Sequence, residues 1–171
     1  MGLDGAPFNP TKVNGIPLGV ELIPEKLKKL DYKNHFIGKW HGGFCHQNLT
    51  PTERGFDSFY GFYSGAVNYL THESKFNAEE VALDYRKVEN GTETILKDKN
   101  GVYTTADFTD QAIEKLDDFD AEGGNLLFVS YNAPHAPHIV PENMDDAYAN
   151  ETLLSRRRRN YLNVIYDMAK D

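Results

Sequence analysis

The apolar residues of this chain occur in short runs, and the densest of them is Leu126-Leu127-Phe128-Val129. A run of this length suits a buried strand and falls far short of the ~18 apolar residues that a membrane-spanning helix needs. Gly123-Gly124 precede it, while Pro134 and Pro137 follow it, so a strand over 126–131 has a defined start and end. The chain is therefore predicted to build a packed core that includes buried strands, with no membrane span.

Other segments show helical or extended patterns on either side of this strand. Apolar residues recur at helical spacing in the segments 22–31, 104–119 and about 151–165, whereas 32–40 is expected to be extended. The last helix is expected to turn Leu154, Leu162, Ile165 and Met168 inward, and the second one to bury Phe108, Ala112, Ile113, Leu116 and Phe119.

Two further segments complete the predicted fold. Residues 81–97 alternate around Asn90-Gly91, a dipeptide that suits a tight hairpin turn. The segment 55–63 is rich in glycine and aromatic residues and is expected to be packed but mostly irregular. Together the patterns predict an α/β fold, with a mostly parallel sheet flanked by helices plus a β-hairpin.

Charge and cysteine content exclude several classes of protein. The chain has 18 basic and 26 acidic residues, a net charge of -8, which argues against binding nucleic acid. Cys45 is the single cysteine, so an internal disulfide or a thiolate metal cluster is excluded. A nucleophilic role for Cys45 is disfavoured because no known local signature surrounds it.

The first candidate site is Gly38-Lys39-Trp40-His41-Gly42-Gly43, at the end of the extended segment 32–40. In an extended chain Lys39 and His41 would point one way and Trp40 the other. This arrangement would clamp an anion, and the alternative is an ordinary surface loop.

The second candidate site is Ala133-Pro134-His135-Ala136-Pro137-His138, directly after the predicted strand 126–131. Open α/β sheets bind ligands at the carboxyl ends of their strands. His135 could donate a hydrogen bond to an anion or act as a general acid, it could share a metal with His138, or it could be a loop histidine bonded to backbone.

Three N-x-[ST] sequons stand at Asn48, Asn90 and Asn150, where chance predicts about one. The amino-terminal residues lack the basic and apolar regions of a signal peptide, which by itself indicates a cytosolic protein. A secretory protein without its own amino terminus would reconcile the two observations, and an asparagine-rich surface is the alternative.

Gly38-Lys39-Trp40-His41 also belongs to a longer pattern. The chain resembles the type I sulfatases, and the arylsulfatase B group most closely, in segments that follow the same order over nearly its whole length. They are Ile16-Pro17-Leu18, Leu22-Ile23-Pro24-Glu25-Lys26-Leu27-Lys28, Tyr32, His35, Pro51-Thr52-Glu53-Arg54-Gly55-Phe56-Asp57, Phe59-Tyr60-Gly61, Tyr69, Phe108-Thr109-Asp110-Gln111-Ala112-Ile113, Leu127-Phe128-Val129, Pro134-His135-Ala136-Pro137-His138, Arg158-Arg159-Asn160-Tyr161 and Asp167.

The resemblance implies an alkaline-phosphatase-like fold and hydrolysis of aryl or glycan sulfate esters through formylglycine and calcium. It implies that Lys39 contacts the sulfate and the formylglycine. His41 would orient the formylglycine hydrate and accept a proton, and His135 would bind the sulfate and help protonate the leaving oxygen.

The chain departs from the family where the nucleophile and the metal are concerned. It has no C-x-P-S-R segment, Cys45 does not match one, and neither the paired acidic residues nor the distal segment that hold calcium are present, so no metal ligands are assigned. Residues 1–171 are therefore expected to be a partial catalytic domain, inactive by itself, whose full-length parent is lysosomal or secreted. Gly42, where the family usually has leucine, is a minor change.

The alternatives are a phosphatase or phosphodiesterase of the same superfamily, a non-catalytic isoform or module that binds sulfated glycans, and an incomplete gene model. The run Arg156-Arg157-Arg158-Arg159 is expected to be a solvated helix face and would support weak glycan binding.

Overall fold

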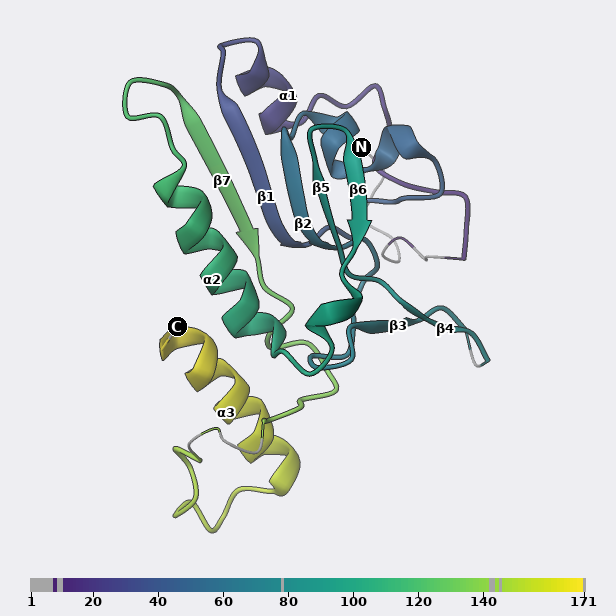
Figure 1. Cartoon of the computed structure of the whole chain (residues 1–171). Helices are drawn as coiled ribbons and strands as arrows, with labels where there is room; N and C mark the ends of the chain where they lie inside the picture. Colours follow the sequence, from purple (N-terminus) through teal and green to yellow (C-terminus); the bar gives the residue numbers. More distant parts are fainter. Residues whose placement is uncertain (1–7, 9–10, 78, 142–143, 145, 171) are drawn as a thin grey trace.

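The fold is built around one five-stranded sheet with the strand order β6-β5-β2-β1-β7 (Figure 1). The computed structural model describes residues 8, 11–77, 79–141, 144 and 146–170. In the sheet, β1 (Lys33–Lys39) lies parallel to β2 (Ser58–Phe62) on one side and to β7 (Asn125–Ser130) on the other. The hairpin of β5 (Arg86–Glu89) and β6 (Thr92–Ile95) pairs with β2 in the antiparallel sense. The α/β prediction is confirmed, and the predicted hairpin extends the main sheet.

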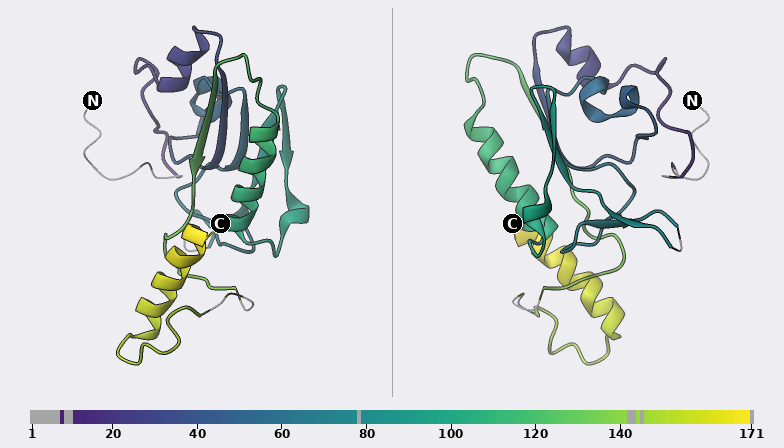
Figure 2. Two further views of the ribbon diagram at one scale, coloured as in Figure 1. Left: turned by 90° about the vertical axis from the view of Figure 1, so that its left-hand side faces the viewer. Right: turned by 45° about the vertical axis from the view of Figure 1, so that its right-hand side comes forward.

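The remaining elements surround this sheet. Figure 2 shows the long helix α2 on one face of the sheet and the short helix α1 on the opposite side. Their bounds are α1 (Ile23–Lys28), α2 (Thr104–Asp117), α3 (Arg156–Lys170), the 3-10 turns η1 (Gln47–Leu49), η2 (Pro51–Arg54) and η3 (Lys97–Lys99), and the two-stranded sheet of β3 (Glu73–Lys75) and β4 (Val81–Leu83).

Side chains alternate across the sheet and form two aromatic cores. The core beneath α2 contains Ile37, Tyr60, Phe62, Val67, Tyr85 and Phe108. The core on the other face contains Phe36, Phe56, Phe59, Tyr63 and Val88. Neighbours in one strand, such as Phe36 and Ile37, thus enter opposite cores, as the two-residue period of a strand requires.

A buried carboxylate ties α2 to the sheet. Asp107 accepts hydrogen bonds from the hydroxyls of Tyr60 (2.7 Å) and Tyr85 (2.6 Å), and Lys99 Nζ lies 2.7 Å from its other oxygen. Burial raises the pKa of both tyrosines above their ordinary value. The hydroxyls therefore stay protonated and act as donors, which satisfies a charge that would otherwise be costly to bury.

The segment predicted to be mostly irregular, 55–63, instead contains the fully buried strand β2. The prediction was wrong because its glycines were interpreted as breakers of regular structure. Gly61 pairs in register with Gly38 of β1, and a Cβ on Gly61 would overlap the Gly38 carbonyl. Glycine here allows two strands to approach closely, which is a known role of glycine inside strands.

The strand predicted to be buried, β7, pairs only with β1 among the described strands and forms an edge of the sheet. Phe128 is 48% exposed, although its ring stacks on Phe36 with centroids 5.0 Å apart. The apolar run predicted the strand correctly, but the exposure of its outer face depends on which strands lie beside it.

Each predicted helix is present with different bounds. Helix α1 ends at Lys28, and Asp31 adopts a left-handed backbone conformation with φ 61°. In α2, Phe108 is fully buried, but Ile113 and Leu116 are exposed, contrary to the prediction.

Helix α3 starts at Arg156 because Ser155 caps it, its Oγ accepting a hydrogen bond from the Arg158 N–H at 3.3 Å. Its buried residues are Asn163 and Val164, and the expected inward residues are half-buried. Val164 packs with Tyr69, Tyr103 and Ala133 in a third core.

A buried arginine joins the amino-terminal segment to the sheet. Arg54 Nε donates to Glu25 at 2.7 Å, and its Nη atoms donate to the carbonyls of Ile16 (3.1 Å) and Val20 (2.8 Å). The hydrogen bond from Arg54 lowers the pKa of Glu25. A buried guanidinium is tolerated here because its donors meet a charge and two carbonyls.

We expect Gly38→Ala to destabilise the protein strongly. Gly38 has φ 108°, and a Cβ would overlap the Ser130 carbonyl of β7. The two effects together should cost ~3 kcal/mol or more in the free energy of unfolding, measured by urea titration.

Gly19→Ala is the matched control, because a Cβ there meets nothing within 4 Å. It should change stability by less than about 1 kcal/mol. Equal stability of the two variants would contradict the close approach of β1 and β7.

Candidate active site

The candidate site lies where three parallel strands end side by side. Gly38 of β1 is in register with Gly61 of β2 and with Ser130 of β7. The residues that follow these positions therefore leave the sheet at the same edge (Figure 1). Both predicted candidate sites, 38–43 and 133–138, come together at this edge, which is where open α/β sheets bind ligands.

Lys39 is the last residue of β1 and is half-buried. Burial lowers the pKa of its ammonium, because desolvation disfavours the charged form. Within the described part of the chain, no acidic side chain forms an ion pair with Lys39. A bound anion would offset this desolvation, so Lys39 suits an anionic ligand.

Trp40 holds the chain between the two candidate polar residues. Its indole Nε1–H is shared between the carbonyls of Gly43 (2.9 Å) and Leu49 (3.1 Å). Its ring packs edge-on against Phe36, with centroids 5.7 Å apart. The indole thus serves as a fixed anchor beside the site.

His41 does not continue the strand. Its backbone is left-handed, with φ 52°, and its N–H donates to the Tyr63 carbonyl at 3.1 Å. The prediction placed Lys39 and His41 on one side of an extended chain and Trp40 on the other, and it is wrong in that the extended conformation does not include His41. Left-handed conformations of residues other than glycine are uncommon and concentrate at functional sites.

The imidazole of His41 is held through its Nε2 atom. Nε2 lies 3.0 Å from the Phe8 carbonyl, which can only accept, so Nε2 carries a proton and Nδ1 is the acceptor of the neutral ring. Burial lowers the pKa of His41, the bond to Phe8 opposes this, and the positive charges of Lys39 and His135 lower it further. Lys39 and His41 follow Gly38 of β1 and His135 follows Ser130 of β7, and Gly38 and Ser130 are in register, so all three predicted residues stand at the same edge of the sheet.

His135 lies in the loop after β7 and is exposed. Its Nδ1–H donates to the Ala136 carbonyl at 2.6 Å, and Nε2 makes no hydrogen bond within the described residues. The buried Tyr69 hydroxyl donates to the His135 carbonyl at 2.8 Å, and the His135 N–H donates to Asn132 at 2.9 Å. These two bonds fix the backbone of His135 and so position its side chain.

His138 lies apart from this group and packs against Tyr161, with ring centroids 5.1 Å apart. Among the residues that the structure describes, no three His, Cys, Asp or Glu side chains gather as a metal site requires. Calcium takes oxygen ligands, mainly carboxylates and carbonyls. The amine and imidazole groups of Lys39, His41 and His135 do not fit calcium, whereas they suit a sulfate.

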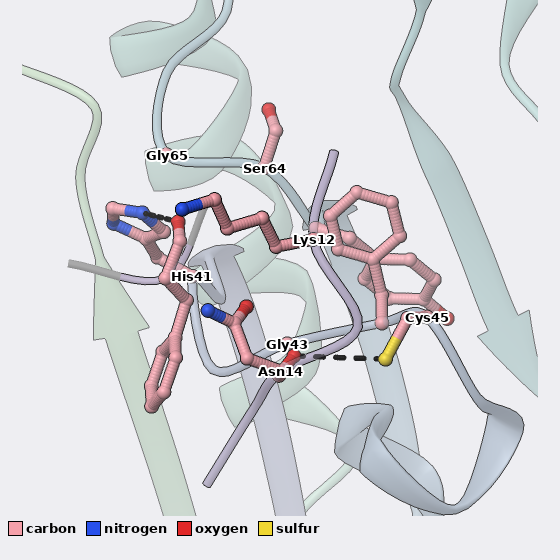
Figure 3. Close-up of a pocket in the computed structure, with 10 residues that line it drawn as sticks. Lys12, Asn14, His41, Gly43, Cys45, Ser64 and Gly65 are labelled. Atoms are coloured by element: carbon pink, nitrogen blue, oxygen red, sulfur yellow. Dashed lines mark hydrogen bonds between the residues drawn. The ribbon is translucent and has the colours of Figure 1, made fainter. Parts of the chain in front are cut away.

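A small pocket adjoins His41 and contains residues that the sequence did not indicate. Figure 3 shows Lys12, Asn14 and Ser64 around it, with His41 on one side and Cys45 on the other. Cys45 is exposed and its Sγ lies 3.6 Å from the Asn14 carbonyl. Cys45 thus lines the same pocket as His41, but its thiol bonds to the Asn14 carbonyl.

Ser64 was missed because the strand before it was not predicted. Had β2 been recognised, Ser64 would have stood at its carboxyl end, next to the ends of β1 and β7. The buried Asp84 carboxylate accepts hydrogen bonds from the N–H groups of Tyr63 (3.1 Å) and Ser64 (2.8 Å) and pairs with Arg86 at 3.0 Å. Asp84 therefore positions this turn rather than offering a free negative charge to the site.

The three predicted glycosylation residues are accessible. Asn48 lies in η1, Asn90 at the β5–β6 turn and Asn150 before α3, and all three are exposed. In the part of the chain that the structure describes, no helix is long and apolar enough to cross a membrane.

Comparisons with known proteins identify the family. The Sulfatase family model matches residues 1–169, and the chain therefore belongs to the sulfatase family. Arylsulfatase J of Mus musculus is 35% identical over 157 residues, which is 92% of this chain and 26% of that protein. The chain thus spans about a quarter of the length of this relative.

Solved structures share the fold. The crystal structure of Ps i-CgsB in complex with k-i-k-neocarrahexaose superposes with a TM-score of 0.77 at 24% identity, over 97% of this chain and 38% of that one. The PsFucS1 sulfatase from Pseudoalteromonas sp. gives 0.57 at 17% identity, over 86% and 32%. The sheet and helices described above are therefore part of the alkaline-phosphatase-like fold of sulfatases.

We expect Lys39→Met to raise the pKa of His41. The substitution keeps most of the side-chain volume and removes a positive charge that disfavours the imidazolium. The titration of the His41 ring, followed by NMR, should move to higher pH. Lys26→Met, on the exposed helix α1, should leave it unchanged. An equal response in both variants would contradict the proximity of Lys39 and His41.

Proposed function

We propose that residues 1–171 form part of a sulfatase catalytic domain and supply the sulfate-binding side of its active site. The observation that supports the proposal is the register of β1 with β2 and β7, which brings the segments that carry Lys39, His41 and His135 to one sheet edge in a chain of the sulfatase family. Lys39 binds the sulfate oxygens, which gain negative charge as the S–O bond breaks.

The two histidines take complementary roles in this proposal. His41, whose Nε2–H donates to the Phe8 carbonyl, uses Nδ1 to orient the nucleophile and to accept a proton from it. Nε2 of His135 makes no hydrogen bond within the described residues, and in this proposal the protonated ring binds the sulfate through Nε2 and delivers a proton to the leaving oxygen.

Groups that this chain does not contain complete the proposal. The resemblance assigns the nucleophile to formylglycine, and no C-x-P-S-R segment occurs in the 171 residues. Calcium, when bound, would polarise the sulfate, and residues other than those described here would hold it. The chain by itself is proposed to be inactive.

The substrate is proposed to be an aryl sulfate or a sulfated glycan. The matched Ps i-CgsB structure holds k-i-k-neocarrahexaose, which supports an oligosaccharide as the natural substrate. The alternative is that the protein is a phosphatase or phosphodiesterase of the same superfamily, with a phosphate ester as its substrate. Parallel assays with a sulfate ester and a phosphate ester distinguish the two activities.

In the complete protein that contains these residues, Lys39→Ala should lower kcat/KM for 4-nitrophenyl sulfate by about 10²–10³-fold, because transition-state charge is left unbalanced. His135→Ala should lower it by about 10²-fold. Steady-state assays measure both values, with 4-nitrophenyl phosphate in parallel.

The control is His46→Ala, because His46 is an exposed histidine that precedes η1 and lines neither candidate site. It should retain the wild-type rate. Near-normal rates in Lys39→Ala and His135→Ala would refute the assigned roles, and faster phosphate than sulfate hydrolysis would favour the phosphatase.

We propose that the protein is lysosomal or secreted and that Asn48, Asn90 and Asn150 carry glycans. Their exposure supports the proposal, since a glycosylated asparagine must project into solvent. After expression through a eukaryotic secretory pathway, an N-glycosidase should reduce the mass by three glycans. Replacement of each asparagine by glutamine should remove one. An unchanged mass would contradict the proposal.

A further inference from the structure

A groove lies between the loop that carries His135 and helix α3. Its walls come from the loop residues Ala136, Pro137 and His138 and from the first two turns of α3, with Arg156, Arg157 and Asn160. The Asn160 amide lies 3.4 Å from the His138 carbonyl, which joins the helix to the loop. The groove is therefore formed by two elements that a hydrogen bond holds together.

The charges in this groove are arranged unfavourably for the protein alone. Arg156 and Arg157 occupy the first turn of α3, and that turn contains no acidic residue. A helix amino terminus carries partial positive charge, so the helix dipole disfavours cations there. Consecutive cations also repel one another. A bound anion would relieve this repulsion.

The four arginines at positions 156–159 differ in the contacts that their side chains make. Arg159 pairs with Asp146 at 3.9 Å, and Arg158 lies over the Tyr161 ring at 5.2 Å. Within the described residues, Arg156 and Arg157 form no such ion pair or ring contact. The two arginines that line the groove are thus the two whose charges remain available, in a chain whose net charge is -8.

The groove and the candidate active site adjoin the same loop. Ala136 and Pro137 directly follow His135, and they also line a second depression that reaches Gly65. Gly65 in turn lines the pocket beside His41. Shared lining residues thus link the groove, through this second depression, to the pocket beside His41.

We propose that Arg156 and Arg157, assisted by His138, bind a second anionic group of a glycan whose reacting sulfate lies at Lys39 and His135. The inference rests on the proposed function and narrows its substrate class to glycans with at least two anionic groups. Guanidinium groups suit this task, because they bind sulfate or carboxylate through paired hydrogen bonds.

Isothermal titration of the 171-residue chain with a sulfated chondroitin tetrasaccharide tests the proposal. Arg156→Ala and Arg157→Ala should each weaken binding by about tenfold, the usual loss for a charge-assisted hydrogen bond. Arg158→Ala removes the same charge from the same helix but lies outside the groove, and it should bind as the wild type does. A desulfated tetrasaccharide, which retains its carboxylates, distinguishes the two kinds of anion.

The outcomes are distinct. Equal losses in all three variants would show a general charge effect and would overturn the proposal, as would wild-type binding by Arg156→Ala and Arg157→Ala. In the complete protein, both groove variants should lower kcat/KM for the tetrasaccharide about tenfold relative to that for 4-nitrophenyl sulfate. Absence of any sulfate hydrolysis by the wild type would refute the proposed function, while the titrations would still decide the groove.

Discussion

The close approach of three strands at Gly38 is the constraint on which the rest of this structure depends. Gly38 lies between Gly61 and Ser130, and a side chain at Gly38 would overlap the backbone of β7. The absence of that side chain lets β1, β2 and β7 end together. The residues after those strands then occupy one small region, so two segments nearly 100 residues apart in sequence can contribute to one site.

The electrostatics of that region follow from what surrounds it. Lys39 is half-buried without an acidic partner among the described residues, and its charge contributes to lowering the pKa of His41. The buried Asp84 carboxylate, which supports the turn at Tyr63 and Ser64, is already engaged by two backbone amides and Arg86. Positive charge is therefore uncompensated where the strands end, in a chain that is acidic as a whole. Such a region attracts an anion.

The loop that follows β7 links this region to the arginine groove. Tyr69, fully buried in the third core, holds the His135 carbonyl, and the Asn132 amide donates to Val67 at 2.9 Å. The His135 side chain bonds within this loop, whereas the His138 ring packs against Tyr161 of α3. Helix α3 adds its arginines because Val164 packs into the same core as Tyr69. One buried cluster thus positions both ends of the proposed glycan site.

The sequence by itself determined the features that depend on neighbouring residues. Asn90-Gly91 specified the hairpin turn, apolar runs specified β1 and β7, and the polar residues after them marked the site. The tertiary structure alone decided that β2 is a strand, that Phe128 lies at an edge, that Ile113 faces solvent and that His41 turns out of the strand. The physical reason is that periodicity is a local property of a segment. Exposure and strand order depend on distant segments, and only folding brings those segments together.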